Sequence, residues 1–281
     1  MDRDTLRSLF DLTGRVAIVT GGTRGIGRSI AEGFAAAGAA VVVASRKPEA
    51  CAETAAHLTA MGGRALGVPT HMGDLDGLAP LVARTVDAFG SVDIVVNNAA
   101  TAVTLPLGRF TADAWSKVYD VDLRGPVFLV QEALPHLERS GHAAVINVIS
   151  AGAFLFSANV AMYAAAKAGL MSYTRSMAAA YAPLGIRVNA LAPGTVDTDM
   201  VRNNPPELQA SMANAGLLRR AANPDEMVGP ALFLASDASS FVTGGGSFGR
   251  RRPRPPLSGR PPPDARWRRT KRTPRSVGAG R

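Results

Sequence analysis

The sequence predicts an α/β fold, in which a doubly wound parallel sheet carries helices on both faces. From Val16 to Gly244, short β-branched runs alternate with longer Ala-rich segments of helical period. Strands that alternate with helices form βαβ units with right-handed crossovers and a parallel sheet. Hydrophobic residues make up 47% of the 281-residue chain, which is enough to fill the core of one such domain.

The strands are expected to be buried on both faces, because their apolar runs are continuous rather than alternating. The six runs are Val16–Thr20, Ala40–Ala44, Ala65–Val68, Ile94–Asn97, Ala144–Ser150 and Arg187–Ala192. Helices are expected to begin near Gly25, Pro48, Asp74, Thr111, Val160 and Pro224. The polar segment Asn203–Gly216 separates the sixth strand from the last helix, and we expect it to act as a mobile lid over substrate.

The chain after Gly244 differs in composition from the rest. Residues 245–281 contain 12 Lys and Arg, one acid and seven prolines, so the residues before them hold 19 of the 31 basic and 21 of the 22 acidic side chains. We expect residues 1–244 to form one nearly neutral domain and the Arg/Pro-rich tail, 245–281, to be disordered. Out-of-frame translation would explain the abrupt change. An arm that binds nucleic acid or another anionic surface is a less favoured alternative.

The composition also argues against several kinds of site. Cys51 is the only cysteine, so no intrachain disulfide can form, and the four scattered histidines argue against a catalytic metal. No run of about 18 apolar residues predicts a membrane span. The N-terminus lacks the apolar core of a signal peptide, and we expect a cytoplasmic location.

A glycine-rich loop joins the first expected strand to the first expected helix. Its sequence is TGGTRGIG at residues 20–27, with Gly21, Gly25 and Gly27 spaced as TGxxxGxG and Thr23, Arg24 and Ile26 between them. Backbone N–H groups in such a turn can approach a pyrophosphate, and the helix N-terminus adds partial positive charge. The position of the loop, more than its glycines alone, predicts a Rossmann-type dinucleotide site.

The end of the second expected strand bears on cofactor choice. A carboxylate there would accept hydrogen bonds from a ribose 2′-OH and select NAD, but the sequence has Ser45 and Arg46. These residues and Arg24 could instead hold a 2′-phosphate. We therefore expect NADP(H) to be preferred and NAD(H) to be possible, with a solvated basic loop as the alternative.

Tyr163 and Lys167 form a YxxxK pair on one face of an expected helix. A free tyrosine has a pKa near 10, and a nearby ammonium group is expected to lower it, so that Tyr163 can exchange a proton with a carbonyl or alcohol oxygen. Ser150 follows the fifth expected strand, at the sheet edge where ligands bind, and can hydrogen-bond the substrate oxygen. A YxxxK pair alone is a weak signal, so the prediction depends on all three residues and the loop.

Together these motifs resemble those of the short-chain dehydrogenase/reductase family. They are TGGTRGIG at 20–27, NNAA at 97–100, Ser150, YAAAK at 163–167, and Pro193-Gly194 followed by Thr198. The resemblance covers about Leu12 to Gly244, with the motifs in the same order.

The resemblance implies a role for each matching residue. Tyr163 would be the acid/base, Lys167 would tune it and bind the nicotinamide ribose, and Ser150 would orient the substrate carbonyl. Asn97 would line the cofactor cleft. The Pro193-Gly194 turn, the backbone near Val196, and Thr198 would hold the carboxamide of a nicotinamide that exchanges hydride with substrate.

The sequence departs from the family pattern at four places. Ala100 stands where the family has Gly, and His71 replaces the usual adenine-contacting Asp, although Asp74 is close. Asp122 replaces the Asn that helps hold a water in the proton relay behind Lys167, so we expect reduced activity and a gain in kcat on Asp122→Asn. The seventh strand expected after Gly244 is missing.

We expect an oxidoreductase acting on a ketone/secondary alcohol pair, with a 3-oxoacyl thioester reductase as the nearest competitor. A protein that binds cofactor but is catalytically weak or inactive is the alternative of another class, and binding of nucleic acid is not favoured. The family's long helices, here Thr111–Arg139 and Val160–Ala182, imply an oligomer. Without the seventh strand we expect a homodimer rather than a tetramer.

Overall fold

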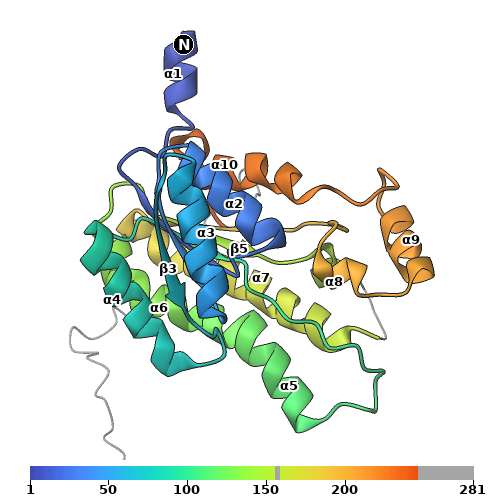
Figure 1. Cartoon of the computed structure of the whole chain (residues 1–281). Helices are drawn as coiled ribbons and strands as arrows, with labels where there is room; N and C mark the ends of the chain where they lie inside the picture. The colour runs from blue at the N-terminus through green and yellow to red at the C-terminus, as the bar shows by residue number, and fades with distance from the viewer. Residues whose placement is uncertain (156–158, 246–281) are drawn as a thin grey trace, which may run out of the picture. The chain divides into compact units, whose positions relative to one another are not determined.

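The computed structural model describes residues 1–155 and 159–245 and contains one six-stranded parallel sheet in the order β3-β2-β1-β4-β5-β6 (Figure 1). The strands are β1 (Val16–Thr20), β2 (Ala40–Ser45), β3 (Arg64–Pro69), β4 (Ile94–Asn97), β5 (Ala144–Val148) and β6 (Arg187–Leu191). The helices are α1 (Arg3–Ser8), α2 (Gly25–Ala36), α3 (Pro48–Ala60), α4 (Leu78–Phe89), α5 (Ala112–Tyr119), α6 (Gly125–Leu137), α7 (Ala161–Tyr181), α8 (Asp199–Arg202), α9 (Pro206–Ala215) and α10 (Val228–Ala235). The predicted Rossmann-type fold is confirmed.

Helices cover both faces of the sheet, as the continuous apolar strands predicted (Figure 1). Within β1, Ala17 and Val19 face the core made with α2, α3 and α10. Ile18, between them, faces the core made with α4, α6 and α7. Every residue of β1 is buried, because alternate side chains enter opposite apolar layers.

The strand order reverses between β1 and β4, which are paired in parallel from Ala17–Ile94 to Val19–Val96. The helices that follow these two strands lie on opposite faces, so a crevice opens beyond the carboxyl ends of β1 and β4. The glycine loop after β1 and the NNAA segment after β4 therefore meet at this crevice.

Two predicted elements differ in detail. The helix expected over Thr111–Arg139 is divided into α5 and α6 by a π-helical turn, Asp120–Arg124, which buries Asp122. The segment Asn203–Gly216, which we expected to act as a lid, is largely helical, because α9 occupies most of it. Gln209 at its start donates from Nε2 to the carbonyl oxygens of Arg202 and Asn204, at 2.9 and 2.7 Å, which ties α9 to α8.

β6 is the edge strand, and within residues 159–245 no further strand follows it. Residues 242–245 nevertheless lie along its outer side. Gly244 N–H donates to Val188 O at 2.8 Å, and Asn189 Nδ2 donates to Val242 O at 2.8 Å. The proposed tail lies outside the described residues from 246 onward. No helix in the described part of the chain is both long and apolar enough to cross a membrane.

Candidate active site

A cavity of about 500 Å³ lies at the carboxyl edge of the sheet and contains most of the predicted site residues. The predicted residues that line it are Gly21, Thr23, Arg24, Gly25, Ile26, Gly27, Ser45, Arg46, Ser150, Tyr163, Lys167, Pro193, Gly194, Val196 and Thr198. Asn97 and Asp122 do not line it. One cavity thus joins the glycine loop to the Tyr163–Lys167 pair.

The glycine loop has a conformation that larger residues could not adopt. Gly21 has a φ of +63°, in the left-handed region that favours glycine. A Cβ on Gly27 would collide with Asn98 Nδ2 and the Gly21 carbonyl oxygen. The loop therefore leaves its backbone accessible at the start of α2, where N–H groups and the helix dipole suit a phosphate. This geometry fits the pyrophosphate of a dinucleotide.

The expectation that Asn97 lines the cleft is wrong for its side chain. Asn97 is 1% exposed, and its Nδ2 donates to Asn147 Oδ1 at 2.8 Å and to Pro126 O at 3.3 Å. Its neighbour Asn98 lines the cavity, where Nδ2 donates to Thr20 O at 2.8 Å. Successive side chains of a strand point to opposite sides, so a shift of one residue moves the amide from the cleft to the interior.

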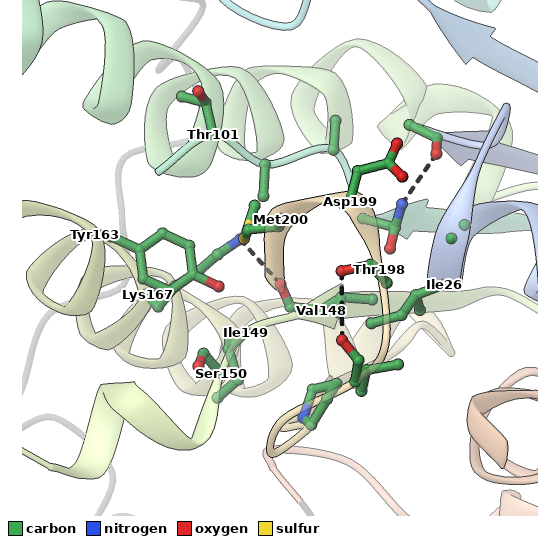
Figure 2. Close-up of a pocket in the computed structure, with 18 of the residues that line it drawn as sticks. Ile26, Thr101, Val148, Ile149, Ser150, Tyr163, Lys167, Thr198, Asp199 and Met200 are labelled. Carbon is green, nitrogen blue, oxygen red and sulfur yellow. Dashed lines mark hydrogen bonds between the residues drawn. The ribbon is translucent and has the colours of Figure 1, made fainter. Parts of the chain in front are cut away.

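The catalytic candidates converge on one end of the cavity (Figure 2). Tyr163 and Lys167 come from the first turns of α7, and Ser150 begins the 3-10 turn Ala151–Phe154 after β5. Lys167 Nζ lies 5.7 Å from the centre of the Tyr163 ring and donates to Val148 O at 3.1 Å. A hydrogen bond with Ser150 lowers the pKa of Tyr163, which opposes the larger effects of its surroundings. The predicted serine, tyrosine and lysine are therefore brought together.

Asp122 contacts Lys167 from behind the cavity wall. Its Oδ2 lies 3.5 Å from Lys167 Nζ, and its Oδ1 accepts the Thr101 N–H at 2.7 Å. The Asp122 side chain is fully buried, and Oδ2 accepts no hydrogen bond. Burial raises the pKa of Asp122 to about 6, although Lys167 and the bond from Thr101 oppose the rise.

Tyr163 does not have the lowered pKa that the sequence led us to expect. Burial and the nearby Asp122 carboxylate raise the pKa of Tyr163 to about 12. The larger cause is burial, which disfavours the charged phenolate; the second is the negative charge of Asp122, which lies beside the lysine that was expected to stabilise the phenolate. The Asp122 carboxylate, at a position where the family has Asn, thus also raises the pKa of Tyr163, the expected acid/base.

Two other departures from the family pattern, His71 and Ala100, concern residues that line the cavity. His71 lines the cavity, and its Nδ1 accepts the Gly73 N–H at 3.0 Å. Asp74 does not take its place, because its Oδ1 accepts from Asp76 N–H at 3.2 Å and caps the turn Leu75–Gly77. Ala100 lines the cavity without a positive φ, so this position does not require glycine.

The end of the cavity near β2 carries the predicted 2′-phosphate residues. Ser45 Oγ accepts from Thr23 Oγ1 at 3.2 Å, and Arg46 beside it is exposed. Arg24, however, points to another partner, because its Nη1 lies 2.9 Å from Asp199 Oδ2 at the start of α8. Of the three predicted 2′-phosphate residues, Ser45 and Arg46 have no ion pair with a carboxylate of residues 1–155 and 159–245.

The opposite wall is built by the chain after β6. Val196 pairs with Ala222 in a short parallel bridge, and Thr195 Oγ1 donates to Met212 O at 2.8 Å, which fixes α9 over the cavity. Apolar side chains line this wall and the turn after Ser150, at Leu155, Met200 and Met212. The sequence led us to expect an apolar pocket formed by Phe154–Val160 and Asn203–Gly216, which include Leu155 and Met212. Sequence reasoning did not identify Met200, because it lies outside both segments and shares no spacing with the catalytic motif. Among the described residues no cluster of His, Cys, Asp or Glu could hold a metal ion.

Comparisons with known proteins agree with this geometry. The family described as enoyl-(acyl carrier protein) reductase matches residues 21–247. Cis-4-hydroxycyclohexanecarboxylate dehydrogenase from Sinomonas cyclohexanicum is 42% identical over 82% of this chain and 92% of its own. A 3-oxoacyl-[acyl-carrier-protein] reductase from Synechocystis is 36% identical over 83% and 94% of the two chains.

Solved structures of similar proteins are also of oxidoreductases. A putative NAD(P)-dependent gluconate 5-dehydrogenase from Beutenbergia cavernae, with bound NADP, has a TM-score of 0.79 and 37% identity and covers 84% of this chain and 95% of its own. A 3-oxoacyl (acyl-carrier-protein) reductase from Agrobacterium tumefaciens C58, with NADP bound, has a TM-score of 0.80 and 36% identity over 85% and 94%. The fold, the site and these similarities together show that the chain belongs to the short-chain dehydrogenase/reductase family of oxidoreductases.

Proposed function

We propose that this protein is an NADP(H)-dependent oxidoreductase that interconverts a ketone and a secondary alcohol, with Tyr163 as the acid/base. The observation that carries the proposal is the single cavity in which Ser150, Tyr163 and Lys167 meet the glycine loop. Two structural neighbours of this chain hold NADP. When bound, the nicotinamide supplies or accepts a hydride at C4.

The protein's own groups handle the oxygen of the substrate. The Ser150 hydroxyl donates a hydrogen bond to the carbonyl oxygen and holds it beside Tyr163. Tyr163 gives its hydroxyl proton to that oxygen during reduction and takes it back during oxidation. Lys167 donates to Val148 O, lies with its Nζ 5.7 Å from the centre of the Tyr163 ring and is available to bind a ribose hydroxyl.

The preference for NADP(H) rests on the charge at the end of β2. Ser45 and Arg46 offer a hydroxyl and a guanidinium where a carboxylate would favour NAD. Pro193, Gly194, Val196 and Thr198 would hold the carboxamide at the other end of the cavity. NAD(H) is the second cofactor that this site can accept.

The substrate class follows from the apolar wall. Leu155, Met200 and Met212 favour a hydrophobic or alicyclic body attached to the reacting carbon. A 3-oxoacyl thioester is the second candidate, because relatives named for that reaction cover most of this chain. A catalytically weak cofactor-binding protein is the third, supported by the effect of Asp122 on Tyr163.

We also propose a cytoplasmic homodimer for the domain of residues 1–244. Trp115 on α5, Phe128 on α6 and Tyr173 on α7 are 46%, 37% and 47% exposed, so these helices present aromatic surface that a second copy could cover. Light scattering after size exclusion measures the mass directly.

The test of activity uses NADPH and NADH with a panel of cyclic ketones, straight-chain ketones and 3-oxoacyl thioesters. Tyr163→Phe is expected to lower kcat by about 100-fold or more while cofactor binding is retained, because only the transferable proton is removed. Tyr173→Phe on the same helix is the matched control and should leave kcat unchanged. Full activity of Tyr163→Phe would contradict the proposed role of Tyr163, and cofactor binding without turnover of any substrate would favour the weak or inactive protein.

A further inference from the structure

An ion pair joins the two sides of the cofactor cavity. Arg24 belongs to the glycine loop, and its Nη1 lies 2.9 Å from Oδ2 of Asp199, the first residue of α8. The two segments are in close contact, since a Cβ on Gly25 would lie 3.0 Å from Thr198 Cγ2. Figure 2 shows Asp199 and Thr198 together with Ile26 of the glycine loop at one end of the pocket. The pair therefore bridges the loop that would bind phosphate and the wall built by α8.

Asp199 is exceptional among the groups around this cavity. It is the only carboxylate among the described residues that line it. The cationic side chains of the lining are Arg24, Arg46, Lys117 and Lys167. A cavity with this balance of charge suits an anionic ligand, and its one carboxylate lies directly on one of the cations.

The pair is weak enough to exchange. Its side chains are 68% and 48% exposed, and ion pairs of this exposure contribute about 0–1 kcal/mol because water and salt screen them. A phosphate offers the guanidinium more charge and two parallel hydrogen bonds. When Arg24 exchanges Asp199 for a phosphate, it therefore loses little interaction free energy and gains more.

We propose that Asp199 is an internal competitor of the cofactor: it occupies Arg24 in the free protein and is displaced by a phosphate of the dinucleotide. Asp199 thereby sets the affinity for cofactor without being part of the reaction. The phosphate is either the 2′-phosphate, which only NADP(H) has, or the pyrophosphate, which both cofactors have. This inference rests on the proposed dinucleotide cofactor.

The chain contains a matched control two residues away. Asp197 is 51% exposed, carries the same charge and belongs to the same segment, but its carboxylate pairs with Arg202 at 2.8 Å instead of Arg24. Asp199→Asn and Asp197→Asn thus change the net charge equally. Only the first releases Arg24.

The experiment is a fluorescence titration of the full chain with NADPH and with NADH, in about 0.05 M and about 0.5 M salt. Asp199→Asn is expected to lower the Kd for NADPH about three- to fivefold at low salt, and Asp197→Asn to leave it unchanged. A gain for NADPH alone identifies the 2′-phosphate as the new partner of Arg24, and an equal gain for NADH identifies the pyrophosphate. The gain should shrink at high salt.

Several results would overturn the proposal. An unchanged or raised Kd for Asp199→Asn shows that Asp199 does not compete, and an equal gain from Asp197→Asn shows a general effect of net charge. In both cases the wild-type protein still binds cofactor and the proposed function stands. If the wild-type protein binds neither cofactor, the proposed function fails and this inference fails with it.

Discussion

Two pairs of a cation and an aspartate lie at the same cavity, and the pair with the longer distance between its charges has the greater effect on the chemistry. Arg24 and Asp199 lie 2.9 Å apart, with side chains 68% and 48% exposed. Lys167 and Asp122 lie 3.5 Å apart, with side chains 1% and 0% exposed. The longer pair has the greater influence, because charges removed from water are screened far less and cost more to ionise.

The difference shows where an aspartate can alter chemistry. Burial raises the pKa of Tyr163 most, and the Asp122 carboxylate raises it further. Its own pKa rises to about 6 because burial outweighs the attraction of Lys167. Asp199 can be exchanged for a solvent ion or a phosphate, whereas Asp122 can only ionise or take up a proton.

The largest expected effect is a pH dependence of stability that Asp122 causes. Its pKa is about 6 in the folded protein and 3.8 for a free aspartate side chain, so the folded state binds more protons between these values. Stability therefore falls as the pH rises from about 4 to about 6 and is not regained above that range. The loss is on the order of 3 kcal/mol. Urea unfolding of the wild type and of Asp122→Asn at several pH values measures it as a difference.

The difference between the wild type and Asp122→Asn has to be measured, because exposed carboxylates change the stability with pH in the opposite direction. Glu226, for example, has a pKa lowered to about 2 by its hydrogen bonds with Arg220 and the Asn223 N–H, so it loses stabilising interactions at low pH. Asp120→Asn is the matched control, since Asp120 belongs to the same π-helical turn but pairs with Arg124 at 3.2 Å nearer the surface. A constant difference between wild type and Asp122→Asn from pH 4 to 7 would refute the assignment.

The next largest expected effect is a change in kcat caused by Asp122→Asn. Asp122→Asn keeps an oxygen for the Thr101 N–H and removes the negative charge beside Lys167. The pKa of Tyr163 should then fall, and kcat at pH 7 should rise about three- to tenfold, which corresponds to about 1 kcal/mol. Steady-state rates with NADPH across pH 5–9 measure both changes. Asp120→Asn should follow the wild type, and an equal or lower kcat for Asp122→Asn would eliminate the idea that this aspartate limits the reaction.

Sequence reasoning succeeded where the pattern is local. The continuous apolar runs predicted all six strands, because strands covered by helices on both faces are mostly apolar, even though β4, β5 and β6 each contain one buried asparagine. The order of loop, serine and YxxxK predicted the contents of the cavity, because parallel strands bring their carboxyl ends to one edge.

Sequence reasoning failed where the result depends on a shift of one position or on a partner far away along the chain. The side chain that lines the cleft after β4 is Asn98 instead of Asn97, and a one-residue shift has no signature in composition. The π-helical turn that buries Asp122 adds a residue to a helix of ordinary period. The Arg24–Asp199 pair joins residues 175 positions apart, and no spacing along the chain predicts it.

The smallest effect is the contribution of the exposed pair to folding. Asp199→Asn is expected to change the free energy of unfolding by less than about 0.5 kcal/mol, because both side chains are hydrated before and after the change. Arg15 and Asp237 offer a pair of similar length, 2.8 Å, in which the arginine is only 7% exposed.

Asp237→Asn leaves the Arg15 guanidinium buried with the Ala235 carbonyl as its other partner, so a loss of about 1–3 kcal/mol is expected. Urea unfolding of both variants at pH 7 compares two ion pairs that differ in burial but hardly in distance. Equal losses would mean that distance, and not burial, determines how much each ion pair contributes to stability. Burial would then give no reason to expect a larger effect on the chemistry from Asp122 than from Asp199.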